Sequence, residues 1–321
     1  MKKALALPKP RVNPALFFLI PALTLIAIFY VVPLFLSIYI SFTPLKNWNI
    51  QKYLGEVTTY NYERLIHMIR YDPDFGMVVK TTLFFVPVTL LINVLGGLAL
   101  ALATFLMEEA VSLPTRVLWI LPRMTPVAVY SLMWYYFFLG DASGTLNNLL
   151  MRLGIIDQPV NWGNDPNLLP YSAWTILVIV NALVGVSFGM VVFYSALRSI
   201  PREHIIAARI DGASTWQLVR HILIPQLRWH LIYVTVWQLL SLLTTYTHIF
   251  LLVKWGAVHK YWGSTWALYV FNKAFEAEWG SEQGLAAAAA TILVIIGSVL
   301  GLIALRILGY GKMMGEPRGE L

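Results

Sequence analysis

A polar segment between Pro201 and Pro225 has the residue types and spacing of a surface built to contact another molecule. Pro201 suits the first turn of a helix, where the N–H that proline lacks would have no partner. Gly212 can end a helix in the left-handed conformation, and Ser214 followed by Gln217 fits a capping box that starts another. The spacing predicts a helix, a glycine break and a second helix that ends at Pro225. An amphipathic helix pair lying on a membrane surface would show the same signals.

Neutral polar and aromatic residues within long apolar stretches are the second group that could do chemistry. Ionisable residues are scarce there, with Lys80, Arg123 and His248 as the exceptions. A carrier driven by protons or sodium usually needs buried acids, so these stretches favour a neutral polar solute such as a sugar. The candidate solute contacts are Asn93, Tyr130, Trp134, Tyr135, Asn181, Gln238, Ser241, Thr244, Thr245 and Tyr246. The same side chains could instead join helix to helix or lie in interfacial aromatic belts.

Enzyme chemistry finds little support in the sequence. The chain has no cysteine, which excludes disulfides, thiol catalysis and cysteine metal sites. The apolar stretches carry no His/Asp/Glu cluster for a metal and no Ser/His arrangement for hydrolysis. The phosphate-binding pattern G-x-x-x-x-G-K-[ST] is absent. We therefore expect no catalytic residue, no metal site and no cofactor on this chain, and an integral membrane enzyme is the least favoured class.

The composition places the 321-residue chain among membrane proteins. It is 58% hydrophobic and 12% charged, with a mean hydropathy of +0.68, whereas soluble domains carry about 25% charged residues. The net charge of +7 does not indicate nucleic acid, because the basic residues follow a membrane topology. We predict an all-α membrane protein with six transmembrane helices. The expected spans are about 14–42, 77–107, 115–139, 171–197, 229–252 and 285–308.

The distribution of Lys and Arg predicts the orientation of these spans. The first span follows Lys2, Lys3, Lys9 and Arg11, and its apolar core is too long for a signal peptide. If both termini are cytoplasmic, the cytoplasmic segments hold thirteen Lys/Arg and the outer segments eight. Five of the thirteen lie in the 198–228 loop. We expect one membrane domain, 1–321, with outer segments of about 43–76, 140–170 and 253–284.

Smaller signals predict details of the spans. Close helix packing is expected at Gly97…Ala101, Gly185…Gly189 and Gly297…Gly301. Kinks are expected at Pro21, Pro33, Pro87 and Pro126. Three roles are open for the last outer segment, which are membrane anchoring, a docking surface and a gate on the solute path. Its aromatic residues are Trp255, Trp262, Trp266, Tyr269 and Trp279.

The 198–228 loop resembles the cytoplasmic coupling loop of bacterial ABC importer permeases. That family shows Glu-Ala-Ala, three residues, Gly, nine residues and Ile-x-Leu-Pro, and its carbohydrate branch adds Ile-Pro and Asp-Gly-Ala-Ser. The matching residues are Ile200-Pro201, Ala207-Ala208, Asp211-Gly212-Ala213-Ser214 and Ile222 to Pro225. Shorter matches at Asn61-Tyr62, Arg116 with Leu121-Pro122, and Gly144 to Asn147 are similar to the maltose/glycerol-phosphate type. Two positions differ from the family pattern, since Ile206 replaces its glutamate and Ile224 replaces its leucine.

The resemblance implies the fold, the partners and the role of the loop. It implies a type I ABC importer permease fold in a bacterial or archaeal plasma membrane, which moves an oligosaccharide or related polar carbon source by alternating access. The implied partners are a second permease subunit, two ATPase subunits that hold ATP and Mg²⁺, and an extracytoplasmic solute-binding protein. The implied ATPase-coupling residues are Glu203, Ile206, Ala207, Ala208, Asp211, Gly212 and Ala213.

Three questions stay open from the sequence. Glu203 lies three residues before Ile206, so either Glu203 takes over the ionic contact of the family's glutamate or packing by Ile206 replaces it. The solute could be glycerol phosphate or a polyol instead of an oligosaccharide. A secondary carrier that needs no ATPase is the alternative class, against which the loop and the missing intramembrane acids argue.

Overall fold

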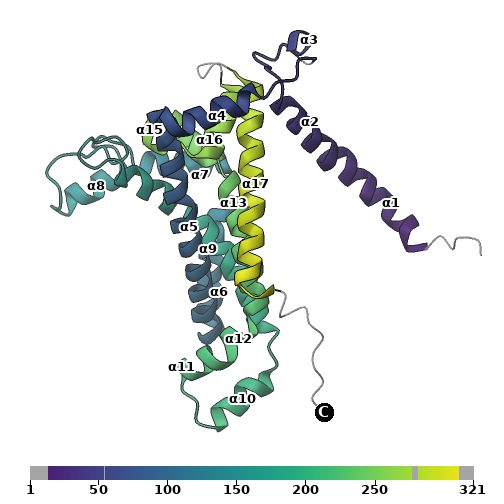
Figure 1. Ribbon diagram of the computed structural model, residues 1–321. Coiled ribbons are helices and arrows are strands. Elements are labelled where there is room, and N and C mark those ends of the chain that lie inside the picture. The colour runs from purple at the N-terminus through teal and green to yellow at the C-terminus, as the bar shows by residue number, and fades with distance from the viewer. Residues whose placement is uncertain (1–13, 54, 277–280, 311–321) are drawn as a thin grey trace, which may run out of the picture.

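The computed structural model describes residues 14–53, 55–276 and 281–310, and no strand occurs among them (Figure 1). Lys2, Lys3, Lys9, Arg11, Trp279, Lys312 and Arg318, used in the sequence predictions, lie outside these residues. The longer elements are α1 Pro14–Ile26, a π-helical turn Ala27–Val31, α2 Val32–Ser41, α5 Pro73–Leu106, α6 Glu109–Met124, α9 Tyr171–Arg198, α13 Arg228–Thr244 and α17 Gln283–Ile307. The shorter elements are α3 Ile50–Tyr53, α4 Tyr60–Tyr71, α7 Val127–Phe137, α8 Thr145–Arg152, α10 Arg202–Ile210, α11 Thr215–Leu218, a π-helical turn Val219–Leu223, α12 Ile224–Gln226, α14 Thr247–Lys254, α15 Lys260–Gly263 and α16 Trp266–Phe275.

Within the residues that the structure describes, five helical segments are long and apolar enough to cross a membrane. They are Phe18–Ser41, Pro73–Leu106, Tyr171–Arg198, Arg228–Lys254 and Gln283–Ile307. Each agrees within a few residues with one of the six predicted spans.

The remaining predicted span, 115–139, is not one continuous helix. Here α6 and α7 form a pair bent by 100° at Thr125 and Pro126. Proline disfavours helical geometry in the residue before it, and Thr125 accordingly has ψ 132°. The chain therefore leaves the helix for two residues and restarts in a new direction. Pro126 was expected to kink this span, and it breaks it.

The spans form a bundle around α5 and α9, which lie side by side, with α13 and α17 alongside (Figure 1). The α4, α15 and α16 helices cover one end of this bundle, called here the α4 end. The α10, α11 and α12 helices lie at the opposite end, called here the α10 end. The helix made by α1 and α2 extends away from the bundle, and none of the residues in its apolar window is buried.

Small residues allow α5 and α9 to approach closely. A Cβ atom added to Gly97 of α5 would lie 2.8 Å from Gly189 Cα of α9, too near for two carbon atoms. Ala101, one turn beyond Gly97, is fully buried. The predicted packing at Gly97…Ala101 and Gly185…Gly189 is thereby confirmed. Gly297 also faces another span, because an added Cβ would lie 3.3 Å from Leu243 of α13.

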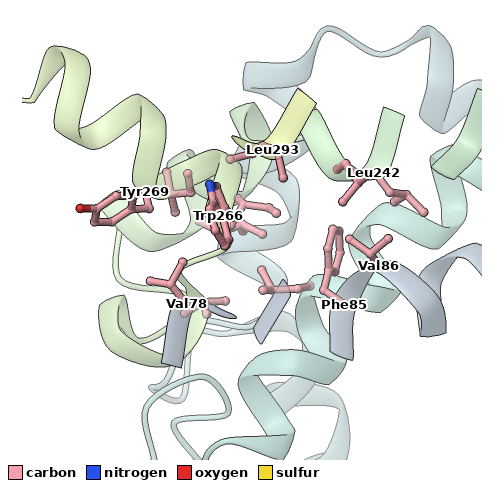
Figure 2. Close-up of a cluster of buried hydrophobic side chains, with 14 of the residues drawn as sticks. Val78, Phe85, Val86, Leu242, Trp266, Tyr269 and Leu293 are labelled. Atoms are coloured by element: carbon pink, nitrogen blue, oxygen red, sulfur yellow. The ribbon is translucent and has the colours of Figure 1, made fainter. Parts of the chain in front are cut away.

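Trp266 and Tyr269 of α16 belong to the core, which corrects the expectation that these two residues anchor or dock. Trp266 is 6% exposed and Tyr269 is 3% exposed. Figure 2 shows both in one cluster with Val78, Phe85 and Val86 of α5, Leu242 of α13 and Leu293 of α17. The Trp266 Nε1–H donates to the Ala289 carbonyl at 3.0 Å, which satisfies its one buried polar group.

An ion-pair cluster joins distant segments at the α4 end. Glu282, just before α17, accepts hydrogen bonds from Arg64 of α4, and Lys46 and Lys273 approach it at 3.8 and 3.7 Å. Partial burial raises the pKa of Glu282. The hydrogen bond and charge of Arg64, together with the two lysine charges, lower it by a larger amount, so the pKa lies below its usual value. The cluster therefore stabilises the ionised carboxylate.

The close approach of α5 and α9 predicts an asymmetric effect of two similar substitutions. Gly97→Ala should lower the free energy of unfolding by about 1–3 kcal/mol, because its methyl group has no space against Gly189. Gly76→Ala, in the same helix with nothing within 4 Å, should be neutral or slightly stabilising. Thermal unfolding in detergent measures both. Equal melting temperatures for the two variants would contradict the packing of Gly97.

The Glu282 cluster predicts a pH-dependent contribution to stability. Glu282→Gln should cost about 2 kcal/mol near neutral pH, because it removes charge-assisted hydrogen bonds. The folded pKa lies below the ordinary value of 4.5, so the wild-type advantage should persist above pH 4.5 and disappear as the pH falls through the lower folded value. Free energies of unfolding, measured for both proteins from neutral pH to below pH 4.5, test this prediction. The exposed Glu56→Gln variant is the control, and a pH-independent difference for Glu282→Gln would refute the explanation.

Candidate functional site

The 198–228 loop has the predicted order of helix, glycine break and helix. Gly212 has φ +79°, in the left-handed region where glycine carries no steric cost. The capping box is present, since the Gln217 N–H donates to Ser214 Oγ at 3.3 Å and the Ser214 N–H donates to Gln217 Oε1 at 2.7 Å. Helical structure ends with α12 at Gln226, one residue after the predicted end at Pro225. The π-helical turn Val219–Leu223 widens the helix just before that proline.

The helix α10 divides the predicted coupling residues between two faces. Ala208 is buried in a cluster with Leu197 and Leu218, so it holds the loop against the spans. Glu203, Ala207 and Asp211 are exposed and Ile206 is 55% exposed. Gly212 is also exposed and Ala213 is half-buried. The small side chain open to a partner is therefore Ala207 and not Ala208.

Buried amide side chains connect four helices near the middle of the bundle. Asn93 of α5 donates from Nδ2 to Asn181 Oδ1 of α9 at 3.4 Å and to Gln238 Oε1 of α13 at 3.2 Å. Gln238 Nε2 donates to the Gly185 carbonyl at 2.8 Å, and Asn181 Nδ2 lies 3.4 Å from His248 Nε2 of α14. The structure thus brings Asn93, Asn181 and Gln238 together, and their side chains form hydrogen bonds between helices.

Two acceptors in this region have no hydrogen-bond partner among the described residues. They are Asn93 Oδ1 and Thr89 Oγ1, one helical turn apart on α5. A hydrogen bond between membrane helices contributes about 0.6 kcal/mol on average, whereas an unsatisfied buried polar group costs about 1–3 kcal/mol. The network is therefore only weakly stabilising in this arrangement.

Aromatic candidates on α7 serve mainly packing. The Tyr130 hydroxyl donates to the Val180 carbonyl of α9 at 2.5 Å, and the Tyr130 side chain is 7% exposed. Trp134 stacks on Phe138 with ring centroids 5.5 Å apart. Tyr135 contacts Trp255 edge-on at 6.0 Å. These contacts place α7 against α9 and α14 after the break at Pro126.

The remaining candidates surround a break between α13 and α14. Thr245 has ψ 122° and Tyr246 has φ −139°, so the backbone leaves the helix for two residues inside a span. Thr245 Oγ1 donates to the Ser241 carbonyl at 2.7 Å, while Tyr246 stacks on Phe271 at 4.6 Å. Broken helices of this kind expose backbone groups where a transporter binds its solute.

An exposed stripe on α13 extends these candidates toward the α10 end. The α13 stripe consists of Tyr233, Trp237, Ser241 and Thr244, and its two rings are 51% and 54% exposed. The rings stack with centroids 6.3 Å apart, and Trp237 also stacks on Phe188 of α9. The sequence predictions missed Phe188, Tyr233 and Trp237. Spacing could have revealed Tyr233 and Trp237, which precede Ser241 by eight and four residues.

A cation lies beside this aromatic surface. The Arg123 guanidinium, near the end of α6, lies 5.0 Å from the centre of the Phe188 ring. Arg116 similarly covers Tyr194 at 3.9 Å and also pairs with Glu109 at 2.6 Å. Arg123 has no carboxylate partner among the described residues, so its charge remains available near the α13 stripe.

The chain is similar to known transport proteins over most of its length. Residues 93–310 match the family described as binding-protein-dependent transport system inner membrane component. A probable ABC transporter permease protein of Pyrococcus horikoshii is 31% identical over 313 residues, covering 94% of this chain and 96% of that protein. The lactose transport system permease protein LacF of Rhizobium radiobacter is 25% identical over 286 residues, covering 89% and 91%.

Solved structures show the same fold. A chain from the crystal structure of a bacterial ABC transporter involved in the import of the acidic polysaccharide alginate matches with a TM-score of 0.74 and 18% identity. The match covers 92% of this chain and 94% of that one. The same values hold for the alginate transporter in complex with an alginate pentasaccharide-bound periplasmic protein.

The buried and exposed candidates should respond differently to substitution. Gln238→Met removes two hydrogen bonds between helices while keeping the volume, so it should lower the free energy of unfolding by about 1 kcal/mol. Ser241→Ala, on the exposed stripe, should leave the free energy of unfolding within about 0.5 kcal/mol of wild type. Thermal unfolding in detergent distinguishes them. An unchanged Gln238→Met variant would mean that the amide network does not hold the spans together.

Proposed function

The chain belongs to the binding-protein-dependent transport system inner membrane component family and has the type I ABC importer permease fold, and we propose that it is the permease subunit of an ATP-driven importer for an oligosaccharide or related polar carbon source. The observation that carries this proposal is the 198–228 loop, which presents Glu203, Ile206 and Ala207 to solvent at one end of the spans. A permease that is driven by another subunit needs such a contact surface. The lactose permease relative supports a sugar as solute.

The proposal divides the work among several chains. ATP and Mg²⁺ belong to two ATPase subunits that bind at the α10 end, and this chain is not itself an enzyme. A second permease subunit completes the path, and a solute-binding protein docks at the α4 end. The chain lies in the plasma membrane of a bacterium or archaeon as one membrane domain, with both termini and the 198–228 loop cytoplasmic. The thirteen-to-eight distribution of Lys and Arg supports this orientation.

Buried contacts suit the loop for transmitting motion to the spans. Leu223 precedes α12 and Leu227 follows it, and both side chains are almost completely buried. They join the cluster that holds Ala208 and Phe193 of α9. A packed core of this kind moves as a unit and does not deform continuously. A displacement of α10 by the ATPases would therefore move α9 and α13, which carry buried residues of the amide network and, on the exposed side of α13, the α13 stripe.

The α13 stripe and the adjacent helix break are the proposed solute contacts. Tyr233 and Trp237 offer flat apolar faces, while Ser241 and Thr244 offer hydroxyl groups on the same side of the helix. A sugar presents both apolar C–H faces and hydroxyl groups, so this combination suits it. Asn93, Asn181 and Gln238 lie deeper, and they would contact solute only after the spans rearrange.

Arg123 favours a second candidate, an acidic sugar or a phosphorylated polyol. Its guanidinium lies over Phe188, next to Trp237, and so supplies a positive charge beside the stripe. Uptake by reconstituted wild type and by Arg123→Gln separates the candidates. A loss confined to an anionic solute would support this second candidate, and unchanged uptake of the transported sugar would support the neutral one.

Reconstitution tests the proposed class. The chain is purified with the permease and ATPase products of neighbouring genes, inserted into liposomes, and supplied with candidate binding proteins, sugars and glycerol phosphate. ATP-dependent uptake that requires one loaded binding protein would establish the importer and its solute. Uptake by the chain alone without ATP would instead establish a secondary carrier.

Glu203 should support ATPase coupling if it replaces the family glutamate missing at Ile206. Glu203→Ala should then reduce solute-stimulated ATP hydrolysis about tenfold, because removing a charged contact at an interface costs roughly 1.4 kcal/mol or more. Glu108→Ala is the matched control, since Glu108 is another exposed acid and makes no capping hydrogen bond. Hydrolysis is measured with the reconstituted complex. Wild-type coupling in Glu203→Ala would show that Glu203 does not replace the glutamate and leave packing by Ile206 as the contact.

A further inference from the structure

A cleft of about 380 Å³ lies at the α10 end, where α5 and α9 finish and α10 begins. Its floor is apolar and includes Leu197, Ile200 and Leu218, all of them buried. Three arginines also line it, and they are Arg198, Arg202 and Arg209. The cleft therefore combines an apolar interior with a concentrated positive charge.

These arginine charges have no ionic partner within the part of the chain that the structure describes. The acids of the same loop, Glu203 and Asp211, form no ion pair with them there. The first turn of α10 adds to the positive potential, because Pro201 provides no side chain to cap its free N–H groups. An anion in the cleft would lie among three arginine residues and beside the first turn of α10.

The cleft lies at the level where the apolar spans end. Phe105 and Leu106, which line it, are the last residues of α5, while Leu197 and Arg198 are the last of α9. Leu106 is 38% exposed, so the apolar surface of the span continues to the cleft. Phospholipid phosphates lie at this depth, directly above the acyl chains.

We propose that this cleft binds the headgroup of an anionic phospholipid, with the phosphate held by Arg198, Arg202 and Arg209. Basic pockets between helices on the cytoplasmic side of a membrane are suited to such headgroups. The proposal rests on the proposed function for placing the α10 end at the cytoplasmic surface. A bound lipid would fix the start of α10 relative to α5 and α9.

An acidic side chain of an ATPase subunit is the competing occupant, and the geometry of α10 disfavours it. Arg202, Ile205, Ile206 and Arg209 follow the i, i+3, i+4, i+7 spacing of one helical face, and that face lines the cleft. Glu203, Ala207 and Ile210 follow the same spacing on an adjacent exposed face. Ile210 is 81% exposed and suits contact with a protein. The lipid and the ATPase therefore have separate faces, which share Ile206 at their boundary.

Mass spectrometry of the intact full chain in detergent, with any co-purified subunits, tests the proposal. Wild type is mixed with equal amounts of phosphatidylglycerol and phosphatidylcholine, and the retained lipid is counted. The variant Arg198→Gln/Arg209→Gln removes two charges from the cleft. Arg220→Gln/Arg228→Gln is the matched control, because it removes two exposed charges near the same end that do not line the cleft.

We expect wild type and control to retain phosphatidylglycerol in preference to phosphatidylcholine, and the cleft variant to retain about tenfold less phosphatidylglycerol. Equal retention of both lipids by wild type, or equal loss in both variants, would overturn the proposal. Displacement of the lipid by millimolar inorganic phosphate alone would indicate a free-anion site instead. Unchanged lipid with loss of an ATPase subunit would assign the arginines to the protein partner. Lipid retention can be measured on this chain even if no ATPase binds. A failure of the proposed function can therefore be distinguished from a failure of the lipid proposal.

Discussion

The close contact between α5 and α9 determines where the other functional elements lie. Gly97 and Gly189 allow the two backbones to approach until a single added methyl group would overlap. This approach places Asn93 against Gly185, from which Asn93 reaches Gln238 of α13. The same two helices end beside α10 and form part of the arginine-lined cleft. One packing interaction thus connects the middle of the spans to the loop that would receive motion from an ATPase.

Two interruptions of helical backbone give this otherwise regular bundle its shape. At Pro126 the chain turns by 100°, and Tyr130 then attaches α7 to the Val180 carbonyl of α9. At Thr245 and Tyr246 the chain changes less in direction, yet it frees backbone groups within a span. Backbone outside helices is tolerated at membrane depth where protein or a polar cavity surrounds it. The second interruption lies next to the proposed solute contacts on α13.

The sequence was sufficient for the features that depend on local chemistry. Length and apolarity located five spans, and Gly212 with the Ser214 capping box predicted the form of the loop. Features that depend on tertiary packing were not accessible in the same way. An isolated pattern could not show that Pro126 breaks a span when Pro87 remains within the continuous helix α5. Nor could it show that Trp266 and Tyr269 are buried, because aromatic residues near a membrane surface suit anchoring and packing equally well.

The amide network also constrains how a permease of this kind could change state. Each hydrogen bond among Asn93, Asn181 and Gln238 contributes little, since membrane helices find alternative partners when they separate. Asn93 Oδ1 has no partner among the described residues, so this arrangement does not use the full bonding capacity of the cluster. A state that satisfied this oxygen, through a solute hydroxyl or a shifted helix, would recover part of that cost. Ligands shift a protein between states only by their difference in affinity, and a weak, incompletely bonded network keeps the required difference small.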